Sequence, residues 1–182
     1  MIAYKGFEKG LRCRGYQFQM GLNVTSEANC RQNGFHCAED PLDCLSYYSN
    51  MDQSMYCIVN AGGDVHEDGS DSKISCTELT IIKELTHKEF FLHALAYMDA
   101  HPKRVCNGHV HQDSYAELKN HFAVVRGRDP IASGPKGCIL AFAKEDESGN
   151  IIQTSIAEVD GVTVKANTWY GADLTERKGV PV

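Results

Sequence analysis

Short apolar runs separated by glycine or acidic turns dominate the first half of the chain. The runs are rich in aromatic, β-branched and aliphatic residues, which is the pattern of β-strands. They lie at residues 2–7, 12–18, 34–37, 55–61, 74–79 and 81–85. Gly62-Gly63 is expected to end the strand at 55–61, and the acidic residues 64–71 are expected to form an exposed loop.

One helix is predicted within this β-rich part. Asp40 can cap its start, Pro41 fits the first helical position, and Asp43 places negative charge in the first turn. The helix is expected to continue to about residue 49 and to present Leu42 and Leu45 on one face.

The pattern becomes helical at Thr86. Thr86-His-Lys-Glu89 matches a capping box, in which two side chains satisfy free amides at a helix start. Apolar residues then recur at helical spacing until His101-Pro102 ends the run. Ser114-Tyr-Ala-Glu117 is a second capping box and predicts a short helix to about Phe122. Residues 86–123 are therefore expected to form a helical insert.

The last third again predicts strands, at residues 137–144 and 151–159 and from Thr168 onward. Asp160-Gly161 lies between two valines and is typical of a two-residue hairpin turn. The sequence therefore predicts an α+β fold in three parts. These parts are a β-rich N-terminal part with one helix (1–85), the helical insert (86–123) and a C-terminal antiparallel β-meander (124–182).

Composition excludes several classes of protein. The 182 residues are 42% hydrophobic and 23% charged, which is unlike a disordered chain, a collagen or a coiled coil. No apolar run approaches the roughly 20 residues that span a bilayer, so no membrane association is expected. The N-terminus lacks the apolar core of a secretory signal, which favours a cytosolic location and reduced thiols for the eight cysteines. A net charge of −6 argues against nucleic-acid binding by bulk electrostatics.

Histidine and cysteine positions predict neither a metal site nor a cofactor. Cys106-Asn-Gly-His109-Val-His111, flanked by His101 and His121, matches no standard zinc module, and whether this loop binds a metal is left open. His36 and Cys37 are neighbours on a predicted strand, so their side chains point to opposite faces and cannot form a dyad directly. No catalytic residues are assigned, and a protein that is not an enzyme is expected.

Part of the first 85 residues nevertheless resembles ADP-ribosyltransferases. Gly34-Phe-His-Cys37, Pro41-Leu-Asp43 and Tyr47-Tyr48 are similar to that family's glycine–aromatic strand and the helix that follows it. The resemblance implies Tyr47 or Tyr48 as the residue stacking on nicotinamide, Tyr4 or Arg14 as the early strand residue, and Glu78 or Glu84 as the glutamate polarising the ribose. No histidine follows the first strand as the family pattern requires. The same tyrosines also fit core packing on an amphipathic helix. An enzyme of this kind is the alternative function.

Two longer blocks resemble a family of small phage and prophage proteins of undefined function. The first block, within residues 1–85, consists of Tyr4-Lys-Gly-Phe7, Cys13-Arg-Gly-Tyr-Gln-Phe18, Gly34-Phe-His-Cys37, Pro41-Leu-Asp43 and Tyr47-Tyr48. The second, within residues 124–182, consists of Ala132-x-Gly134, Gly137, Val159-Asp-Gly161, Lys165-Ala and Thr168-Trp-Tyr170. Many relatives carry a glycine- and alanine-rich repetitive segment between the blocks, where this chain has residues 86–123 instead.

The phage resemblance implies a function against host defence. By length and signature the chain is similar to anti-CRISPR proteins, which implies a protein of the host cytoplasm that binds a bacterial type II RNA-guided DNA nuclease stoichiometrically and without chemistry. The nuclease's guide or target nucleic acid is a further candidate partner. A phage accessory protein without inhibitory role is the other alternative function.

Acidic loops are the predicted contact residues, because such nucleases hold their heteroduplex in a positively charged channel. The first set is Asp64, Glu67, Asp68 and Asp71, and the second set is Glu145, Asp146 and Glu147. Either set can also be a solvated turn, and the helical insert is an alternative contact surface.

Overall fold

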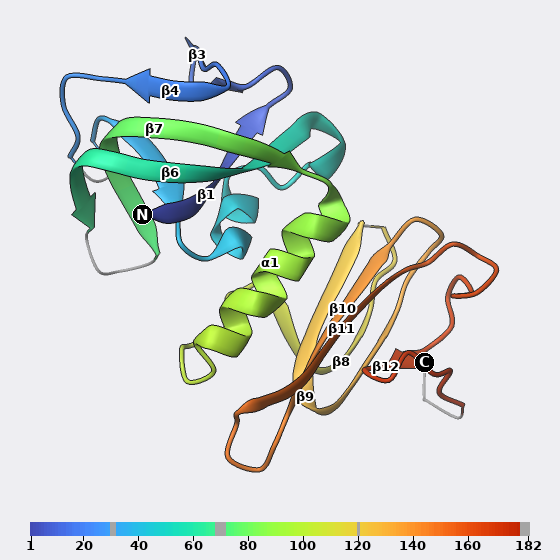
Figure 1. The fold of residues 1–182 in the computed structure, drawn as a ribbon. Helices are drawn as coiled ribbons and strands as arrows, with labels where there is room; N and C mark the ends of the chain where they lie inside the picture. The colour runs from blue at the N-terminus through green and yellow to red at the C-terminus, as the bar shows by residue number, and fades with distance from the viewer. Residues whose placement is uncertain (30–31, 68–71, 120, 179–182) are drawn as a thin grey trace. The chain divides into compact units, whose positions relative to one another are not determined.

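The chain forms two units, shown in a computed structural model that describes residues 1–29, 32–67, 72–119 and 121–178 (Figure 1). Unit 1 is Met1–Phe90 and unit 2 is Phe91–Val182, and each is described by itself. Strands make up 50% and helices 13% of the structure, and most of the sheet is antiparallel, so the predicted α+β class is confirmed. No helix among the described residues has the length and apolarity to cross a membrane.

Unit 1 is a seven-stranded sheet with two short 3-10 helices. Its elements are β1 (Ile2–Glu8), β2 (Arg12–Cys13), β3 (Tyr16–Gln17), β4 (Gly21–Val24), β5 (Phe35–Ala38), η1 (Pro41–Ser46), η2 (Met51–Gln53), β6 (Ser54–Glu67) and β7 (Lys73–Leu85). β1 pairs with both β5 and β6, and β7 pairs with the same two strands on its two edges. These four strands therefore close a circuit around a shared apolar interior.

The core of unit 1 follows the two-residue period of its strands. On β1, Ala3 and Phe7 are buried together with Lys5 between them, while Glu8 is exposed. The core cluster consists of Ala3, Phe7, Phe18, Phe35, Cys37, Cys57, Val59, Ala61, Ile74, Cys76, Leu79 and Ile81. Several cysteines fill the core as small apolar side chains, as expected for reduced thiols.

Two strands of unit 1 are longer than the sequence predicts. β6 continues through Gly62-Gly63 to Glu67, and β7 crosses Thr80 without a break. The expected stop at the glycine pair is wrong because the extra residue is absorbed in a bulge between Gly62 and Val65, after which pairing with β7 resumes. Thr80 pairs with Leu22 of β4 on one edge of β7 and with Asn60 of β6 on the other edge.

The predicted helix start at Asp40 is confirmed, but the helix is a short 3-10 helix. The Asp40 carboxylate accepts a hydrogen bond from the Leu42 N–H at 2.9 Å, and Pro41 opens the helix. Leu42 and Leu45 are buried as expected, and η1 ends at Ser46 rather than near residue 49.

The capping box at Thr86 is confirmed and begins α1 (His87–Ala100). The Glu89 carboxylate accepts from the Thr86 N–H at 2.9 Å, and the Glu89 N–H donates to Thr86 Oγ1 at 3.2 Å. Lys83 Nζ lies 2.6 Å from the same carboxylate. The Lys83 hydrogen bond and the Thr86 amide lower the pKa of Glu89 to about 2, from an ordinary 4.5.

We expect this low pKa to appear in the pH dependence of stability. A carboxyl whose pKa is lower in the folded chain stabilises it fully above about pH 4.5, and that contribution is lost as the pH falls toward 2. In urea unfolding, the wild-type chain should therefore exceed Glu89→Gln in stability at pH 7, and the difference should close between pH 4.5 and 2. Lys83→Met should weaken this dependence, and a difference that stays constant over the interval contradicts the prediction.

Unit 2 is a five-stranded sheet whose central strand has parallel neighbours. Its strands are β8 (Val110–Ala116), β9 (Phe122–Ser133), β10 (Ile139–Glu145), β11 (Ile151–Glu158) and β12 (Tyr170–Gly171). The pairing of β10 with β11 is antiparallel, as expected for a meander. β9 is parallel to both β8 and β10, so the prediction of a purely antiparallel C-terminal sheet is wrong in this detail.

β9 contains a bulge within the stretch that pairs with β8. Gln112 and Ser114 of β8 are two residues apart, but their partners Arg126 and Ile131 are five apart, so β9 bulges between Gly127 and Pro130. The chain then returns and places Ile139 beside Phe122. Every paired residue of β10 lies 17 positions after its partner in β9, and the same spacing of 17 relates residues 114–116 of β8 to β9.

Two local predictions in unit 2 are wrong, each for its own physical reason. Ser114 lies in β8 and not at a helix start, because pairing with β9 outweighs the local capping pattern. Asp160-Gly161 does not join two paired strands. Asp160 Oδ1 instead accepts hydrogen bonds from the N–H groups of Val162, Thr163 and Val164, which closes a compact turn.

Candidate functional site

The outer edge of β6 at residues 62–67, called here the β6 edge, is the candidate partner-binding site. β1 pairs with β6 only as far as Ile2 opposite Asn60. The N-terminal amine of Met1 extends this contact by donating to Asn60 Oδ1 and to the Ala61 carbonyl, both at 2.8 Å. Beyond Ala61, β6 pairs with β7 on its other edge, and no described strand pairs with the β6 edge.

A glycine bulge shapes this edge. Gly63 has a φ of +66°, and a Cβ at this position would overlap the Thr77 side chain, so a larger residue does not fit. The Asp64 N–H donates to Thr77 Oγ1 at 2.9 Å, which ties the bulge to β7. The bulge therefore projects the following residues from an edge that is held in place by the sheet.

Two of the predicted acidic residues lie on the β6 edge. Asp64 and Glu67 are both exposed, and neither carboxylate forms an ion pair with any described residue. Asp64 lies in the bulge, and Glu67 lies opposite Ile74 of β7. Asp68 and Asp71, predicted for the same set, lie outside the described residues. The β6 edge thus combines exposed negative charge with backbone groups that no described strand pairs with.

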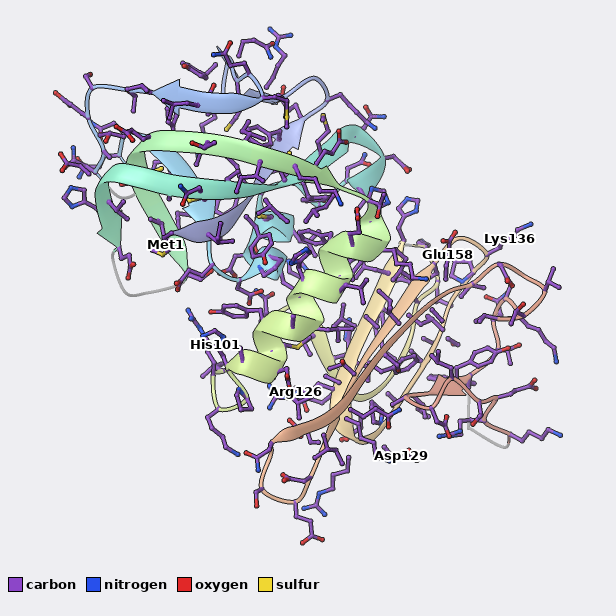
Figure 2. All side chains as sticks on the ribbon, viewed as in Figure 1. Met1, His101, Arg126, Asp129, Lys136 and Glu158 are labelled. Carbon is purple, nitrogen blue, oxygen red and sulfur yellow. The ribbon has the colours of Figure 1, made fainter. Side chains whose placement is uncertain are left out.

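In the second acidic set, Glu145 has a structural partner. Glu145 forms an ion pair with the Arg126 Nε atom, and the Arg126 side chain is only 6% exposed. Arg126 also donates to the Pro102 carbonyl at 2.6 Å, just after the end of α1, and to the Gly149 carbonyl at 3.3 Å. Figure 2 labels Arg126 together with His101, which follows α1. This network joins β9, β10 and two loops of unit 2.

Asp146 is also engaged within its own turn, whereas Glu147 is exposed. The Asp146 carboxylate accepts from the N–H groups of Ser148 and Asn150 at 2.8 Å and from the Asn150 side chain at 2.9 Å. These hydrogen bonds lower the pKa of Asp146. Two of the three residues of this set therefore hold the β10–β11 connection, and the β6 edge is the stronger candidate for a partner.

The histidine-rich loop shows ring stacking. His111 stacks on Tyr115 with ring centroids 3.3 Å apart, and burial lowers the pKa of His111. The Gln112 side-chain amide donates to Cys106 Sγ at 3.5 Å. In the described part of the chain, no three histidine, cysteine or acidic side chains are grouped so that they could hold a metal ion.

The residues implied by the transferase resemblance are spread along unit 1. Tyr47 contacts Lys73 at the start of β7, whose ammonium lies 4.0 Å from the centre of the Tyr47 ring. Glu78 and Glu84 follow Lys73 along β7 by five and eleven residues, which is about 17 Å and about 36 Å along an extended strand. These separations along β7 do not bring either glutamate together with Tyr47.

A second cluster was missed from sequence and surrounds Lys5, whose side chain is buried although it is charged. Lys5 Nζ donates to the His36 carbonyl at 2.7 Å and lies 3.7 Å from Cys13 Sγ. The Tyr48 hydroxyl donates to the same sulfur at 3.0 Å. Burial, followed by the hydrogen bond to Cys13, raises the pKa of Tyr48, so its phenol remains a donor.

Comparison with known proteins places unit 1 in a family. A family model described as a domain of unknown function, DUF7666, matches residues 1–93. The chain belongs to this DUF7666 family. No curated protein and no solved structure matches the chain. The β6 edge and the Lys5 cluster both lie in the DUF7666 segment, whereas the turn at Glu145 lies outside it.

Four of the five motifs quoted for the first block meet at the Lys5 cluster of the DUF7666 segment. Lys5, Cys13, His36 and Tyr48 come from four different motifs, and the contacts above join them. Gly6 belongs here too, because a Cβ at this position would overlap the Tyr48 ring. One signal in the sequence could have indicated the cluster: Lys5 occupies an inward position in the two-residue period of β1.

Proposed function

We propose that this DUF7666 protein is a phage-borne inhibitor that binds a host defence nuclease, in the first place a type II RNA-guided DNA nuclease, and occupies its surface. The observation that carries the proposal is the β6 edge, where exposed carboxylates that form no ion pair with a described residue stand on an edge that no described strand pairs with. Phage origin and the host cytoplasm as its location are supported by the resemblance of the two sequence blocks to phage and prophage proteins.

The chemistry of the β6 edge fits a basic protein surface. An RNA-guided nuclease holds nucleic acid in a positively charged channel and reads its flanking motif with arginines. Asp64 and Glu67 can accept hydrogen bonds from such arginines, and charge-assisted hydrogen bonds of this kind are stronger than neutral ones. Free N–H and C=O groups of the edge can add main-chain hydrogen bonds to an extended segment of the partner.

A cleavage assay with titrated protein tests the proposal. The purified full-length chain is added to the nuclease loaded with guide RNA, with and without NAD, and cleavage of a target DNA is measured. Inhibition that is complete near one chain per nuclease and independent of NAD supports an occupying inhibitor. Inhibition far below equimolar amounts that requires NAD indicates a transferase, and full cleavage at large molar excess contradicts the proposal.

Neutralising the β6 edge should weaken binding in a salt-dependent way. The double variant Asp64→Asn and Glu67→Gln keeps the shape of both side chains and removes both charges. Surface ion pairs contribute about 0.2–1 kcal/mol each, so the loss of two should raise the dissociation constant roughly 2- to 30-fold at low salt and less at high salt. Isothermal titration against the nuclease measures both values.

The matched control is Glu147→Gln, which removes an exposed charge from unit 2. Its dissociation constant should remain at the wild-type value if the β6 edge is the contact. Equal effects of the control and the double variant would assign the result to net charge, and unchanged binding of the double variant would remove the β6 edge as the site.

A further inference from the structure

Lys5 is a buried ammonium whose polar contacts include a thiol. The residue is 5% exposed, and its ammonium lies 5.2 Å from the Phe7 ring centre and 5.4 Å from the Phe18 ring centre. No carboxylate of the described residues forms an ion pair with it. A buried charge is costly without a charged partner, and the ionisable group within contact distance is the Cys13 thiol at 3.7 Å.

A tight hairpin and a close contact hold Cys13 in this position. Cys13 pairs with Tyr16 across a two-residue turn, in which Arg14 and Gly15 both have positive φ. Tyr48 donates to the sulfur from the other side, and its ring can approach because Gly6 has no side chain. Cys13 is a partly exposed residue, so a small molecule in solvent can approach it, while Lys5 and Tyr48 contact its sulfur from the interior.

Four other cysteines, Cys44, Cys57, Cys106 and Cys138, have different surroundings. Burial raises the pKa of Cys44, Cys57 and Cys138 to about 12, which keeps them as thiols. Cys106 is partly exposed like Cys13, but its sulfur contacts the Gln112 amide. Cys106 therefore serves as an internal control, because it is also partly exposed but contacts a glutamine amide where Cys13 contacts a lysine.

We propose that Lys5 and Cys13 form an oxidative modification site that a hydroperoxide converts into a covalent sulfur–nitrogen bond. In the first step the Cys13 sulfur, after losing its proton to water, attacks one peroxide oxygen. The S–O bond forms, the O–O bond breaks and hydroxide leaves. The sulfur is oxidised by two electrons and the peroxide is reduced, which gives a sulfenic acid.

Lys5 then captures the sulfenic acid. After its ammonium releases a proton to solvent, Nζ attacks the sulfur, the S–N bond forms, the S–O bond breaks, and the leaving hydroxide takes a proton to become water. The balance is one thiol, one amine and one hydrogen peroxide giving one sulfenamide and two waters. Sulfenic acids condense with nitrogen nucleophiles in this way, and the bond would fasten the β2–β3 hairpin to β1.

Peptide mapping of the full-length chain tests this site. The reduced protein is treated with hydrogen peroxide, the excess is removed, and the digest is analysed without reductant. The expected product has lost two hydrogens per chain, yields a peptide in which Lys5 is joined to Cys13, and returns to the starting mass with dithiothreitol. Cys13→Ser should abolish the product, and Cys106→Ser should form it as the wild type does.

A conservative variant separates the capture step from the oxidation. Lys5→Arg retains a cation but removes the amine, so the sulfenic acid at Cys13 should accumulate and react with dimedone. The mapping of the wild-type chain decides the matter even if this variant does not fold. A stable sulfenic or sulfinic acid at Cys13 in the wild type, a two-hydrogen loss that maps to a disulfide, or oxidation of Cys106 ahead of Cys13 would each overturn the proposal.

Discussion

Replacing Arg126 by methionine is expected to destabilise unit 2 by about 3–5 kcal/mol, because it breaks a buried ion pair. Methionine retains much of the apolar volume of the arginine stem, so the loss reports the guanidinium group. Without it, the Glu145 carboxylate loses its cation, and the carbonyls of Pro102 and Gly149 lose a donor. Urea unfolding followed by the fluorescence of Trp169, the one tryptophan of the chain, measures the change in unit 2.

Two further variants identify the cause of the expected loss. Arg128→Met alters an exposed arginine two residues away, and its effect should stay below about 0.5 kcal/mol. Adding Glu145→Leu to Arg126→Met removes the unpaired carboxylate and should recover part of the stability. A stability of Arg126→Met within about 0.5 kcal/mol of the wild type would mean that the network contributes little.

Replacing Phe7 by alanine is expected to destabilise unit 1 by about 3–5 kcal/mol, the usual effect of emptying a buried aromatic position. Phe7 is fully buried, and its ring meets Phe18 edge-on at 5.2 Å between centroids. The substitution also removes one of the two rings that face the Lys5 ammonium, so it leaves a cavity beside a buried charge. Urea unfolding followed by far-UV circular dichroism and by hydrogen exchange of the β1 amides measures the effect.

The matched control is Ile2→Ala on the same strand. Ile2 is 56% exposed, so its truncation should change the unfolding free energy by less than about 0.5 kcal/mol. Equal effects at the two positions would indicate that the interior of the strand circuit is not packed as described.

Sequence patterns correctly predicted elements that are stabilised by local interactions, such as a cap and an apolar stripe within the same helix. The capping box at Thr86 is followed by a periodic apolar stripe that includes Phe90, Phe91 and Leu95, and the helix is present. The same motif at Ser114 has no such stripe behind it. There the Glu117 carboxylate accepts from the N–H groups of Leu118 and Lys119, and the preceding residues pair with β9. A capping pattern alone therefore does not decide between helix and strand.

The sequence predicted which acidic residues could form the candidate site, but not where the fold places them. Acidic residues at Asp64 and Glu145 are equally visible in the sequence, yet one stands on an open strand edge and the other pairs with Arg126, 19 residues away. Pairing over such a separation depends on the register of β9 and β10, which local sequence patterns do not specify. Lys5 was predictable as an inward position of β1, but its contact with Cys13 depends on the hairpin turn at Arg14 and Gly15.

The register of unit 2 has a consequence for how such a protein can vary in length. Since β10 repeats the path of β9 at a constant interval of 17 residues, a further segment of that size can enter the ladder as one more rung. Each added rung would extend the sheet by about 4.8 Å while leaving its first and last strands as they are.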